Sequence, residues 1–248
     1  MSSVVSSDLV AYHAATQSSS DTGTVGGAID TLRRPDFTQL AASDTVEVIS
    51  SAAGDTTQTC TVVGRDSQGR LVSQTVTLNG TSAVAFNTLG TVERILSCEL
   101  SATAAGTVTL RRSDHTTAVR AIPIGERGFS MILQKGSSST SVEVDYYAKF
   151  FWKNTNTTNA LLAAAVSDSA NPSGVVTFGL AASQSDSGTA TTRQTAPAGI
   201  SFADTSQNVP STDLAATASI GVWLKFTLAA NQAAIKSSYT SQIAGQTT

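Results

Sequence analysis

Two runs of alternating apolar and polar residues flank the polar segment 65–70, and this pattern predicts a β-hairpin over residues 57–78, TQTCTVVGRDSQGRLVSQTVTL. The positions that share one face are Cys60, Val62 and Gly64 in the first run, and Val72, Gln74, Val76 and Leu78 in the second. Thr and Ser occupy most of the opposite face. We therefore expect one face of this hairpin to meet a core and the other to meet water.

Further alternating runs follow at the short spacing that is typical of a β-sandwich, at 45–49, 92–100 and 107–112. They predict a small immunoglobulin-like sandwich over residues 45–112. The polar segment 113–128, which contains Pro123, is then interpreted as a linker between domains.

A second β-sandwich, immunoglobulin-like or jelly-roll-like, is predicted for residues 129–248. Its expected strands lie at 129–134, 142–152, 160–166, 174–180 and 220–228. The first two would form a hairpin with its tip at 136–139, and 142–152 is apolar on both faces, as in a central strand. A helical turn is the alternative for 160–166. Residues 181–199 are predicted to be a long loop of the kind that contacts partners.

Both ends of the chain lack clear periodicity. Residues 1–44 are predicted to form an extended N-terminal arm, and the residues after 228 a C-terminal tail. Polar termini fray unless something holds them. Either neighbouring subunits clasp the arm, or it wraps around its own domain.

The composition favours an all-β protein without polyanionic partners. Only 13% of the residues are charged, whereas Ser and Thr make up about 28% of the chain. A formal net charge of −3 without long charged runs argues against nucleic acid and anionic membranes as partners. The longest apolar run, 160–166, is too short for a membrane span. No signal peptide is expected at the N-terminus, so synthesis in the cytoplasm is predicted.

The ionisable residues suggest no reaction. Ser113, Asp114 and His115 are adjacent in sequence, whereas a catalytic triad is assembled from separate elements, so a polar linker is the preferred interpretation. His13 is expected to be structural or solvated. Glu143 and Asp145 would share a strand face, but a calcium site needs more oxygen ligands than these two.

Two pairs of basic residues and two cysteines complete the candidates. Arg33–Arg34 and Arg111–Arg112 could meet an acidic partner surface, although solvated pairs are the simpler expectation. Cys60 and Cys98 are expected to be buried free thiols, with a disulfide as the alternative. Two Cys and two distant His are too few for a metal site. We therefore predict no catalytic, cofactor or metal residues and no enzyme activity.

Aromatic side chains offer the best case for a rival function, because aromatic platforms on β-sandwiches can hold sugar rings. The set comprises Tyr146, Tyr147, Phe150, Phe151, Trp152 and Trp223. Strand alternation would place half of them in a core, and an assembly interface could use the rest. Glycan binding remains the alternative.

Several phrases of the sequence resemble a group of virion structural proteins of tailed bacteriophages. They are SDLV at 7–10, VGGAID at 25–30, TVVGRD at 61–66, TVTLNGT at 75–81, VERIL at 92–96 and VWLKFTL at 222–228. Hairpins rich in Ser and Thr that end in LNGT recur in β-sandwich modules of phage heads, necks and tails.

The resemblance implies a non-enzymatic virion subunit, with a capsid decoration or cement protein as the favoured role. Its partners would be its own copies and other virion proteins such as the major capsid protein, and its location would be the virion. A neck or tail protein and a glycan-binding adhesion module are the alternatives. Low charge and hydroxyl-rich strands independently favour a subunit that pairs sheet edges with copies of itself.

Overall fold

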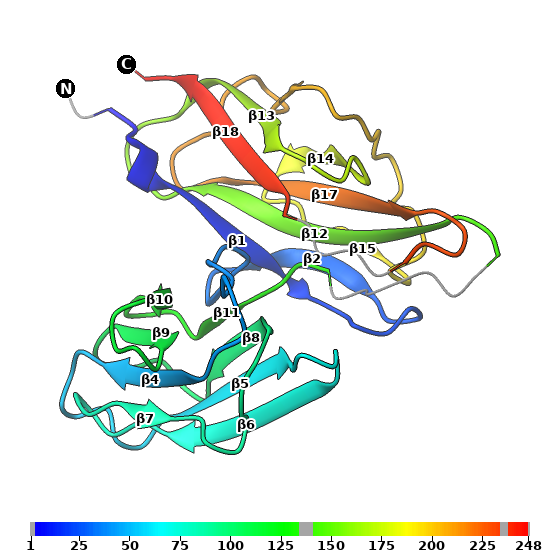
Figure 1. The fold of residues 1–248 in the computed structure, drawn as a ribbon. Coiled ribbons are helices and arrows are strands. Elements are labelled where there is room, and N and C mark those ends of the chain that lie inside the picture. Colours follow the sequence, from blue (N-terminus) through cyan, green and yellow to red (C-terminus); the bar gives the residue numbers. More distant parts are fainter. Residues whose placement is uncertain (1–2, 134–140, 234–237, 248) are drawn as a thin grey trace. The chain divides into compact units, whose positions relative to one another are not determined.

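Strands account for nearly all the regular structure in the computed structural model, which describes residues 3–133, 141–233 and 238–247 (Figure 1). One 3-10 turn, Ser6–Asp8, precedes the first strand. The described residues contain no helix that is long and apolar enough to cross a membrane. The all-β class predicted from the sequence is confirmed. The chain divides into unit 1, Met1–Asp30 with Ile132–Thr248, and unit 2, Thr31–Met131.

Unit 2 is built from two sheets. Its strands are β3 (Arg33–Arg34), β4 (Val46–Ser50), β5 (Thr59–Arg65), β6 (Leu71–Thr77), β7 (Val84–Ala85), β8 (Arg94–Leu100), β9 (Val108–Arg112), β10 (Ala118–Ile122) and β11 (Gly128–Ser130). One sheet has the order β3-β11-β8-β5-β6 and the other β10-β9-β4-β7. Neighbouring strands are antiparallel except for β3 and β11, which are parallel.

A single apolar core lies between these two sheets. Val48 and Leu110 enter it from the four-stranded sheet, and Val62, Leu100 and Phe129 enter it from the five-stranded sheet. Alternate residues of β5 are fully buried, and alternate residues of β6 are exposed, as the sequence pattern predicts. Unit 2 is therefore a β-sandwich, and the predicted hairpin forms its β5–β6 edge.

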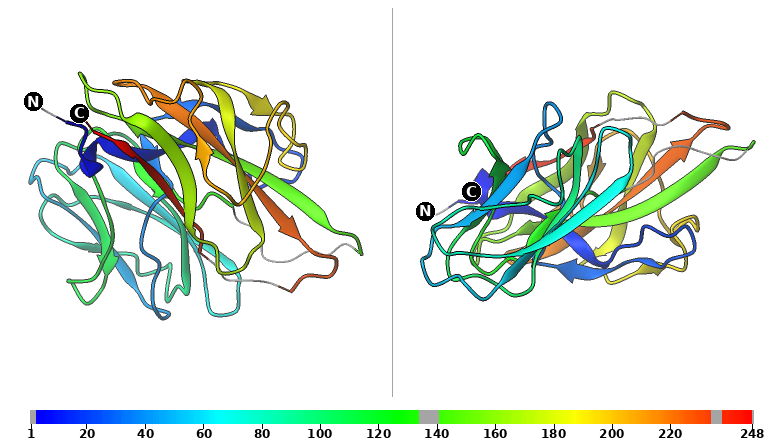
Figure 2. Two further views of the ribbon diagram at one scale, coloured as in Figure 1. Left: turned by 90° about the horizontal axis from the view of Figure 1, so that it is seen from above. Right: turned by 60° about the horizontal axis from the view of Figure 1, so that its bottom comes forward.

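Unit 1 pairs a large sheet with a small one. Its strands are β1 (Leu9–Thr16), β2 (Val25–Asp30), β12 (Val144–Asn154), β13 (Leu162–Ala170), β14 (Val176–Gln184), β15 (Thr189–Ala190), β16 (Gln207–Asn208), β17 (Ser219–Leu228) and β18 (Thr240–Gln246). The orders are β14-β17-β12-β1-β2-β15 and β16-β13-β18. The long strands β12 and β17 run side by side in all views (Figures 1 and 2).

The large sheet of unit 1 is covered on both faces. One face shares a core with the small sheet, to which Phe178, Val222 and Leu224 contribute. The other face carries Tyr147 and Trp223, packed against residues that include Ile200 and Phe202 from the segment after β15. Burial on both faces explains why 142–152 is apolar at consecutive positions, and the predicted central strand is confirmed.

The expected N-terminal arm is instead part of a sheet. Strand β1 lies between β12 and β2, with partners running from Leu9 opposite Asn154 to His13 opposite Phe150. The segment packs on its own chain, which was the second of the two alternatives. A central strand covered on both sides has no reason to alternate apolar and polar residues, so its sequence gave no strand pattern.

The predicted linker and domain boundary also differ from the structure. Residues 113–128 contain β10, which pairs with β9 inside the sandwich of unit 2. Strand β11, predicted to open the second domain, pairs with β3 and β8, so the division falls between Met131 and Ile132. Strands β11 and β12 therefore do not pair as a hairpin. The tip predicted at 136–139 lies outside the described residues.

The remaining strand predictions are confirmed. Segments 45–49, 92–100, 107–112, 160–166, 174–180 and 220–228 overlap β4, β8, β9, β13, β14 and β17, respectively. The C-terminal tail, however, contains β18, which pairs with β13. The predicted loop 181–199 holds the end of β14 and the short strand β15.

Candidate functional site

The strongest concentration of buried charge in unit 1 surrounds Lys149 in the middle of β12. Its side chain is fully buried, and its ammonium group donates to the Asp186 carboxylate at 2.5 Å. The same group donates to the backbone oxygens of Gly27 at 3.0 Å and Gly188 at 3.1 Å. We call Lys149, Asp186 and these two carbonyls the lysine cluster.

Aromatic rings form the walls of the lysine cluster. The ammonium nitrogen lies 4.7 Å from the ring centre of Phe151 and 5.3 Å from that of Trp223. Burial lowers the pKa of Lys149, and the hydrogen bond and charge of Asp186 oppose that effect. Three acceptors match the three protons of an ammonium group, so the geometry suits a charged structural link better than a nucleophilic amine.

Arg193 is a second buried cation in unit 1. Its guanidinium carbon lies 4.9 Å from the ring centre of Tyr146, and its Nη1 donates to the backbone oxygen of Ser18 at 2.9 Å. Its Nε lies 3.7 Å from a carboxylate oxygen of Asp21. Arg193 thus fastens the β1–β2 connection against β12. Sequence reasoning missed both cations, although a lysine inside the apolar run YYAKFFW was an available signal.

The structure does not assemble Ser113, Asp114 and His115 into a triad. Asp114 accepts hydrogen bonds from the backbone and hydroxyl of Thr117, which hold the pKa of the Asp114 carboxyl well below its usual range. His115 Nδ1 instead lies 2.8 Å from Glu47 Oε1. Asp114 thus stabilises a turn, and His115 contacts an acid of β4.

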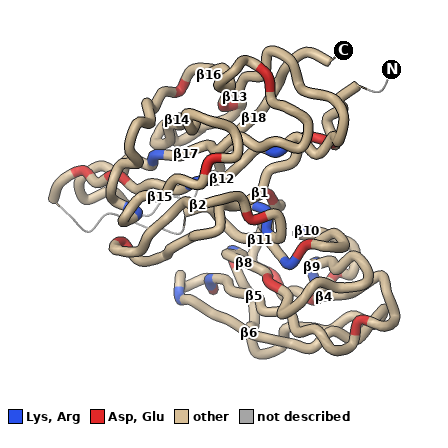
Figure 3. Tube along the Cα trace, turned by 180° about the vertical axis from the view of Figure 1, so that it is seen from behind, with Lys and Arg blue, Asp and Glu red and all other residues tan. Residues whose placement is uncertain are grey.

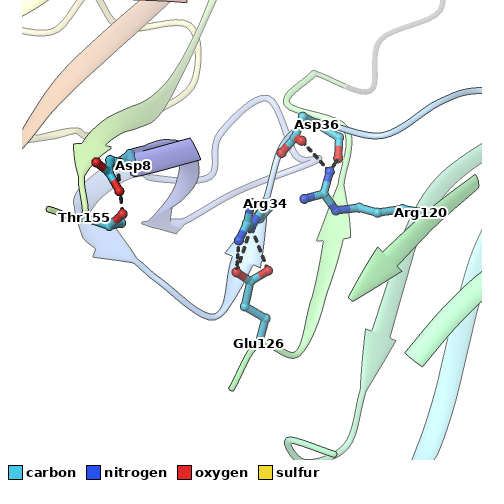
Figure 4. Close-up of polar contacts among 6 residues, drawn as sticks. All are labelled: Asp8, Arg34, Asp36, Arg120, Glu126 and Thr155. Atoms are coloured by element: carbon cyan, nitrogen blue, oxygen red, sulfur yellow. Dashed lines mark hydrogen bonds and ion pairs between the residues drawn. The ribbon is translucent and has the colours of Figure 1, made fainter. Parts of the chain in front are cut away.

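The sequence favoured solvated side chains for the two arginine pairs, but in the structure both pairs contact acids of unit 2. Arg33 pairs with Glu99 at 2.8 Å, and Arg34 makes a two-pronged contact with Glu126 (Figure 4). Glu126 is nearly buried, so this pair fixes the residues before β11 to β3. All of these residues belong to unit 2.

The second arginine pair meets acids on β4 and just before it. Arg111 donates to Glu47 at 2.6 Å, and Arg112 pairs with Asp44. Burial raises the pKa of Glu47, but hydrogen bonds from His115 and Arg111 outweigh it and leave that pKa below its ordinary value. The charges of Arg111 and Arg112 on β9 are therefore neutralised by those of Glu47 on β4 and Asp44 just before it.

Other charged groups also hold the fold together. In unit 2, Arg120 of β10 contacts both the backbone and the carboxylate of Asp36 (Figure 4). In unit 1, the backbone oxygen of Asp8 accepts from the amide of Thr155 at 2.7 Å and from its hydroxyl at 3.0 Å. Figure 3 shows that charged residues are scattered along the trace of each unit rather than gathered in one region.

His13 and the carboxylate pair have structural surroundings as well. His13 is fully buried in β1, so the structural alternative holds and the solvated one does not. Asp145 accepts from the Thr227 hydroxyl at 2.7 Å and pairs with Lys225 at 3.0 Å, whereas Glu143 is exposed before β12. Among the described residues, no three His, Cys, Asp or Glu side chains gather as a metal site would require.

Cys60 and Cys98 are buried free thiols in the core of unit 2, as expected. Their sulfurs lie 3.4 Å apart, on the adjacent strands β5 and β8. The hydrogen bond with Cys60, together with burial, raises the pKa of the Cys98 thiol well above its ordinary value. A high pKa and burial make the Cys98 thiol a poor nucleophile, and the Cys60 thiol is equally buried.

The aromatic set does not form a platform on the surface. Five of its members are at least nine-tenths buried: Tyr146, Tyr147, Phe150, Phe151 and Trp223. Trp152 is half-buried, and its indole nitrogen donates to the Ser241 hydroxyl at 3.0 Å. These rings belong to the core of unit 1. They therefore do not form the exposed aromatic platform on which the prediction of glycan binding rested.

Comparisons with known proteins assign no family. No protein-family profile matches the chain, and no curated protein matches its sequence. Among solved structures, a chain of "Structure of infectious bursal disease virus Gx strain" aligns over 95% of this chain and 69% of its own length, with 11% identity and a TM-score of 0.17. Similarity at that score carries no argument about the fold or the function of this protein.

Proposed function

We propose that this chain is a non-enzymatic structural protein of a tailed-phage virion, and specifically a decoration or cement protein that binds the capsid lattice and its own copies. The role rests on the sequence phrases that resemble those of phage virion proteins and on the kind of surface that the fold presents. A neck or tail component is the nearest alternative location.

One observation carries the proposal: the chemically versatile side chains face inward or pair with one another. Lys149 and Arg193 are buried, and the aromatic rings beside them fill the core of unit 1. In unit 2, the pairs Arg33–Arg34 and Arg111–Arg112 are matched by acids. What the chain offers to partners is therefore strand faces that carry hydroxyl groups, together with the edges of its sheets. Such surfaces suit repeated protein contacts better than recognition of a small substrate.

The experiment uses a host and phage whose genome carries the coding sequence. Empty capsids that lack this protein, and separately purified tails, would each be mixed with the purified chain and sedimented. The proposal expects the chain to sediment with capsids at a fixed, saturable ratio. Binding to tails alone would move the role to the neck or tail.

A retention assay on immobilised polysaccharide tests the glycan alternative in parallel. A chain that ignores capsids and tails but is retained by polysaccharide would overturn the proposal. Trp152→Ala provides a control there, because Trp152 is the one half-buried member of the aromatic set. Loss of retention in this variant would locate a sugar site at that ring.

A further inference from the structure

Strand β6 forms an edge of the five-stranded sheet of unit 2, with β5 as its one neighbour in that sheet. Its seven residues, LVSQTVT, include no charge, no proline and no glycine. The register with β5 shows no shift over the whole strand. Natural sheets usually protect an edge of this kind, because its free backbone groups can pair with another chain.

The phase of the β5–β6 ladder identifies which backbone groups point outward. The amide of Asp66 donates to Arg70 O, and the amide of Leu78 donates to Gln58 O. In an antiparallel ladder these bonds recur at every second residue, so the even-numbered residues of β6 bond to β5. The N–H and C=O groups of the odd-numbered residues, Leu71, Ser73, Thr75 and Thr77, therefore point away from β5. Among the described residues, no backbone group bonds to them.

The other sheet edges formed by described residues are protected. Strands β3, β7, β15 and β16 have two residues each. Edge β14 is bridged by Ala203, and β10 contains Arg120 and is capped by the amide of Thr38 on Val119 O. Strand β18 pairs with β13 through two register shifts. Long, regular and uncharged, β6 stands apart from these edges.

We infer that β6 pairs antiparallel with β6 of a second copy of this chain, which joins two five-stranded sheets across a two-fold axis. An axis at Gln74 places Leu71 opposite Thr77 of the second copy and Ser73 opposite its Thr75. In this register every outward N–H and C=O group of both strands finds a partner, and the contact is self-complementary, as two-fold symmetry requires.

The side chains at this edge also suit a second copy. The outward residues are exposed, and Leu71 is 64% exposed, one of the most exposed large apolar residues of the chain. The pairing would set Ser against Thr and the Leu side chain against a Thr methyl group, and both are favourable cross-strand neighbours. Because the strand carries no charge, two copies meet without opposing like charges.

This inference deepens the self-association part of the proposed function by naming the surface and the partner. A pair of seven-residue strands buries less than the ~800 Å² per partner that stable dimers bury, so we expect a weak dimer that is reinforced when copies are held side by side.

The test measures the purified full-length chain alone by sedimentation equilibrium, from ~10 μM to ~1 mM. We expect a monomer–dimer equilibrium, with amide hydrogen exchange at Ser73, Thr75 and Thr77 slowing as concentration rises. The amides of Gln74 and Val76 already bond to β5 and should not respond. A chain that stays monomeric over the whole range, or odd-numbered amides that do not respond, would overturn the inference.

Two variants address the contact itself. Thr75→Pro removes the outward-pointing backbone N–H of residue 75 and leaves all bonds to β5 intact. Edge strands tolerate proline at positions of this kind. Thr75→Lys places a charge on the edge. Each should weaken dimerisation by about tenfold or more, whereas Thr22→Lys, on an exposed loop of unit 1, should leave it unchanged. Dimers of wild-type strength in both Thr75 variants would rule out this edge.

Thr75→Lys keeps the test independent of any loss of folding in the proline variant, and circular dichroism verifies the fold of both.

Capsid sedimentation separates this inference from the proposed function. Wild-type capsid binding without β6 dimers would overturn the inference alone, and β6 dimers without capsid binding would overturn the capsid role alone.

Discussion

Lys149 Nζ and Asp186 Oδ2 lie 2.5 Å apart, although Lys149 is fully buried and the Asp186 side chain keeps about a quarter of its surface exposed. This contact joins the centre of β12 to the turn between β14 and β15. The carbonyl groups of Gly27 and Gly188 complete the surroundings of the ammonium group. A charge buried so deeply is stable only while all of these partners are present.

Replacing Lys149 by Met is therefore expected to lower the free energy of unfolding of unit 1 by about 3 kcal/mol or more. The variant removes the ammonium donor from the Asp186 carboxylate, from Gly27 O and from Gly188 O, of which Gly188 O keeps the Gly27 amide as a donor. Urea unfolding at pH 7, followed by tryptophan fluorescence, measures this directly, because Trp152 and Trp223 both belong to unit 1.

Lys153→Met is the matched control on the same strand. Lys153 is only half-buried, so we expect this change to alter the free energy of unfolding by about 0.5 kcal/mol or less. Equal losses for Lys149→Met and Lys153→Met would show that the lysine cluster does not stabilise unit 1.

Asp55 gives unit 2 a pH-dependent stability. Its carboxylate accepts hydrogen bonds from the Ser50 hydroxyl at 2.6 Å and from the amides of Ala105 at 2.8 Å and Gly106 at 3.0 Å. Burial raises the pKa of Asp55, but these three hydrogen bonds outweigh it and leave the pKa below its ordinary value. A carboxyl with a lowered pKa stabilises the fold above its unfolded-state pKa and loses that contribution as the pH falls through the folded-state pKa.

Asp55→Asn should accordingly destabilise unit 2 by about 2 kcal/mol at pH 7, because an amide group cannot accept all three bonds. Amide hydrogen exchange in β5 and β8 reports on this unit. The difference between wild type and Asp55→Asn should shrink as the pH is lowered from about 6 toward 2. A difference that grows on acidification would mean that the folded-state pKa is raised rather than lowered.

Gly26 shows how a glycine that is unremarkable in the sequence can be required by packing. Its φ is +103°, and an added Cβ would lie 2.6 Å from the Trp223 ring and 2.8 Å from Gly188 O. Gly26→Ala should therefore lower the free energy of unfolding of unit 1 by about 3 kcal/mol, from overpacking added to backbone strain.

Gly174→Ala separates the two contributions in the same unit. Gly174 has a φ of +64°, but nothing lies within 4 Å of the added Cβ, so strain alone should cost about 1 kcal/mol. Urea unfolding of both variants by tryptophan fluorescence makes the comparison. Similar losses at the two positions would argue against close packing of Gly26 on Trp223.

The hairpin and β1 show how far the sequence allowed the fold to be predicted. Strands β5 and β6 have one face toward the core, so their residues alternate and the pattern indicates strands. Strand β1 is covered on both sides and lies between two neighbours, so its residues follow the demands of distant segments. Its partner β12 is more than 120 residues away, and no local pattern encodes that pairing.

The charged contacts were beyond prediction for a similar reason. Arg34 and Glu126, or Lys149 and Asp186, are brought together only by the sheet order. A pair of arginines in a sequence is compatible with solvent exposure and with ion pairing. Only the residues on the opposite strand distinguish the two. The class of fold and most strand positions could therefore be predicted, but not the domain boundary or the buried polar contacts.

The assignment of residues 1–30 to unit 1 predicts how the chain can be divided. Residues 31–131 contain their own core, to which Leu40 near the start of the segment and Phe129 near its end both contribute. This segment should therefore fold when expressed alone. Deletion of residues 1–30 should instead unfold unit 1, because it removes β1 and β2, which lie between β12 and β15, and with them the Gly27 carbonyl that binds Lys149.

Two measurements distinguish this outcome from that of a dispensable arm. Dispersed amide resonances in the NMR spectrum of 31–131 would establish an independent sandwich. In the chain that lacks residues 1–30, the tryptophan emission should shift to the wavelength of exposed indole, while the β5 and β8 resonances persist. If the tryptophan emission of the shortened chain remained that of the native protein, β1 and β2 would not be the structural strands that their position between β12 and β15 indicates, because inner strands cannot be removed without exposing the backbone of both neighbours.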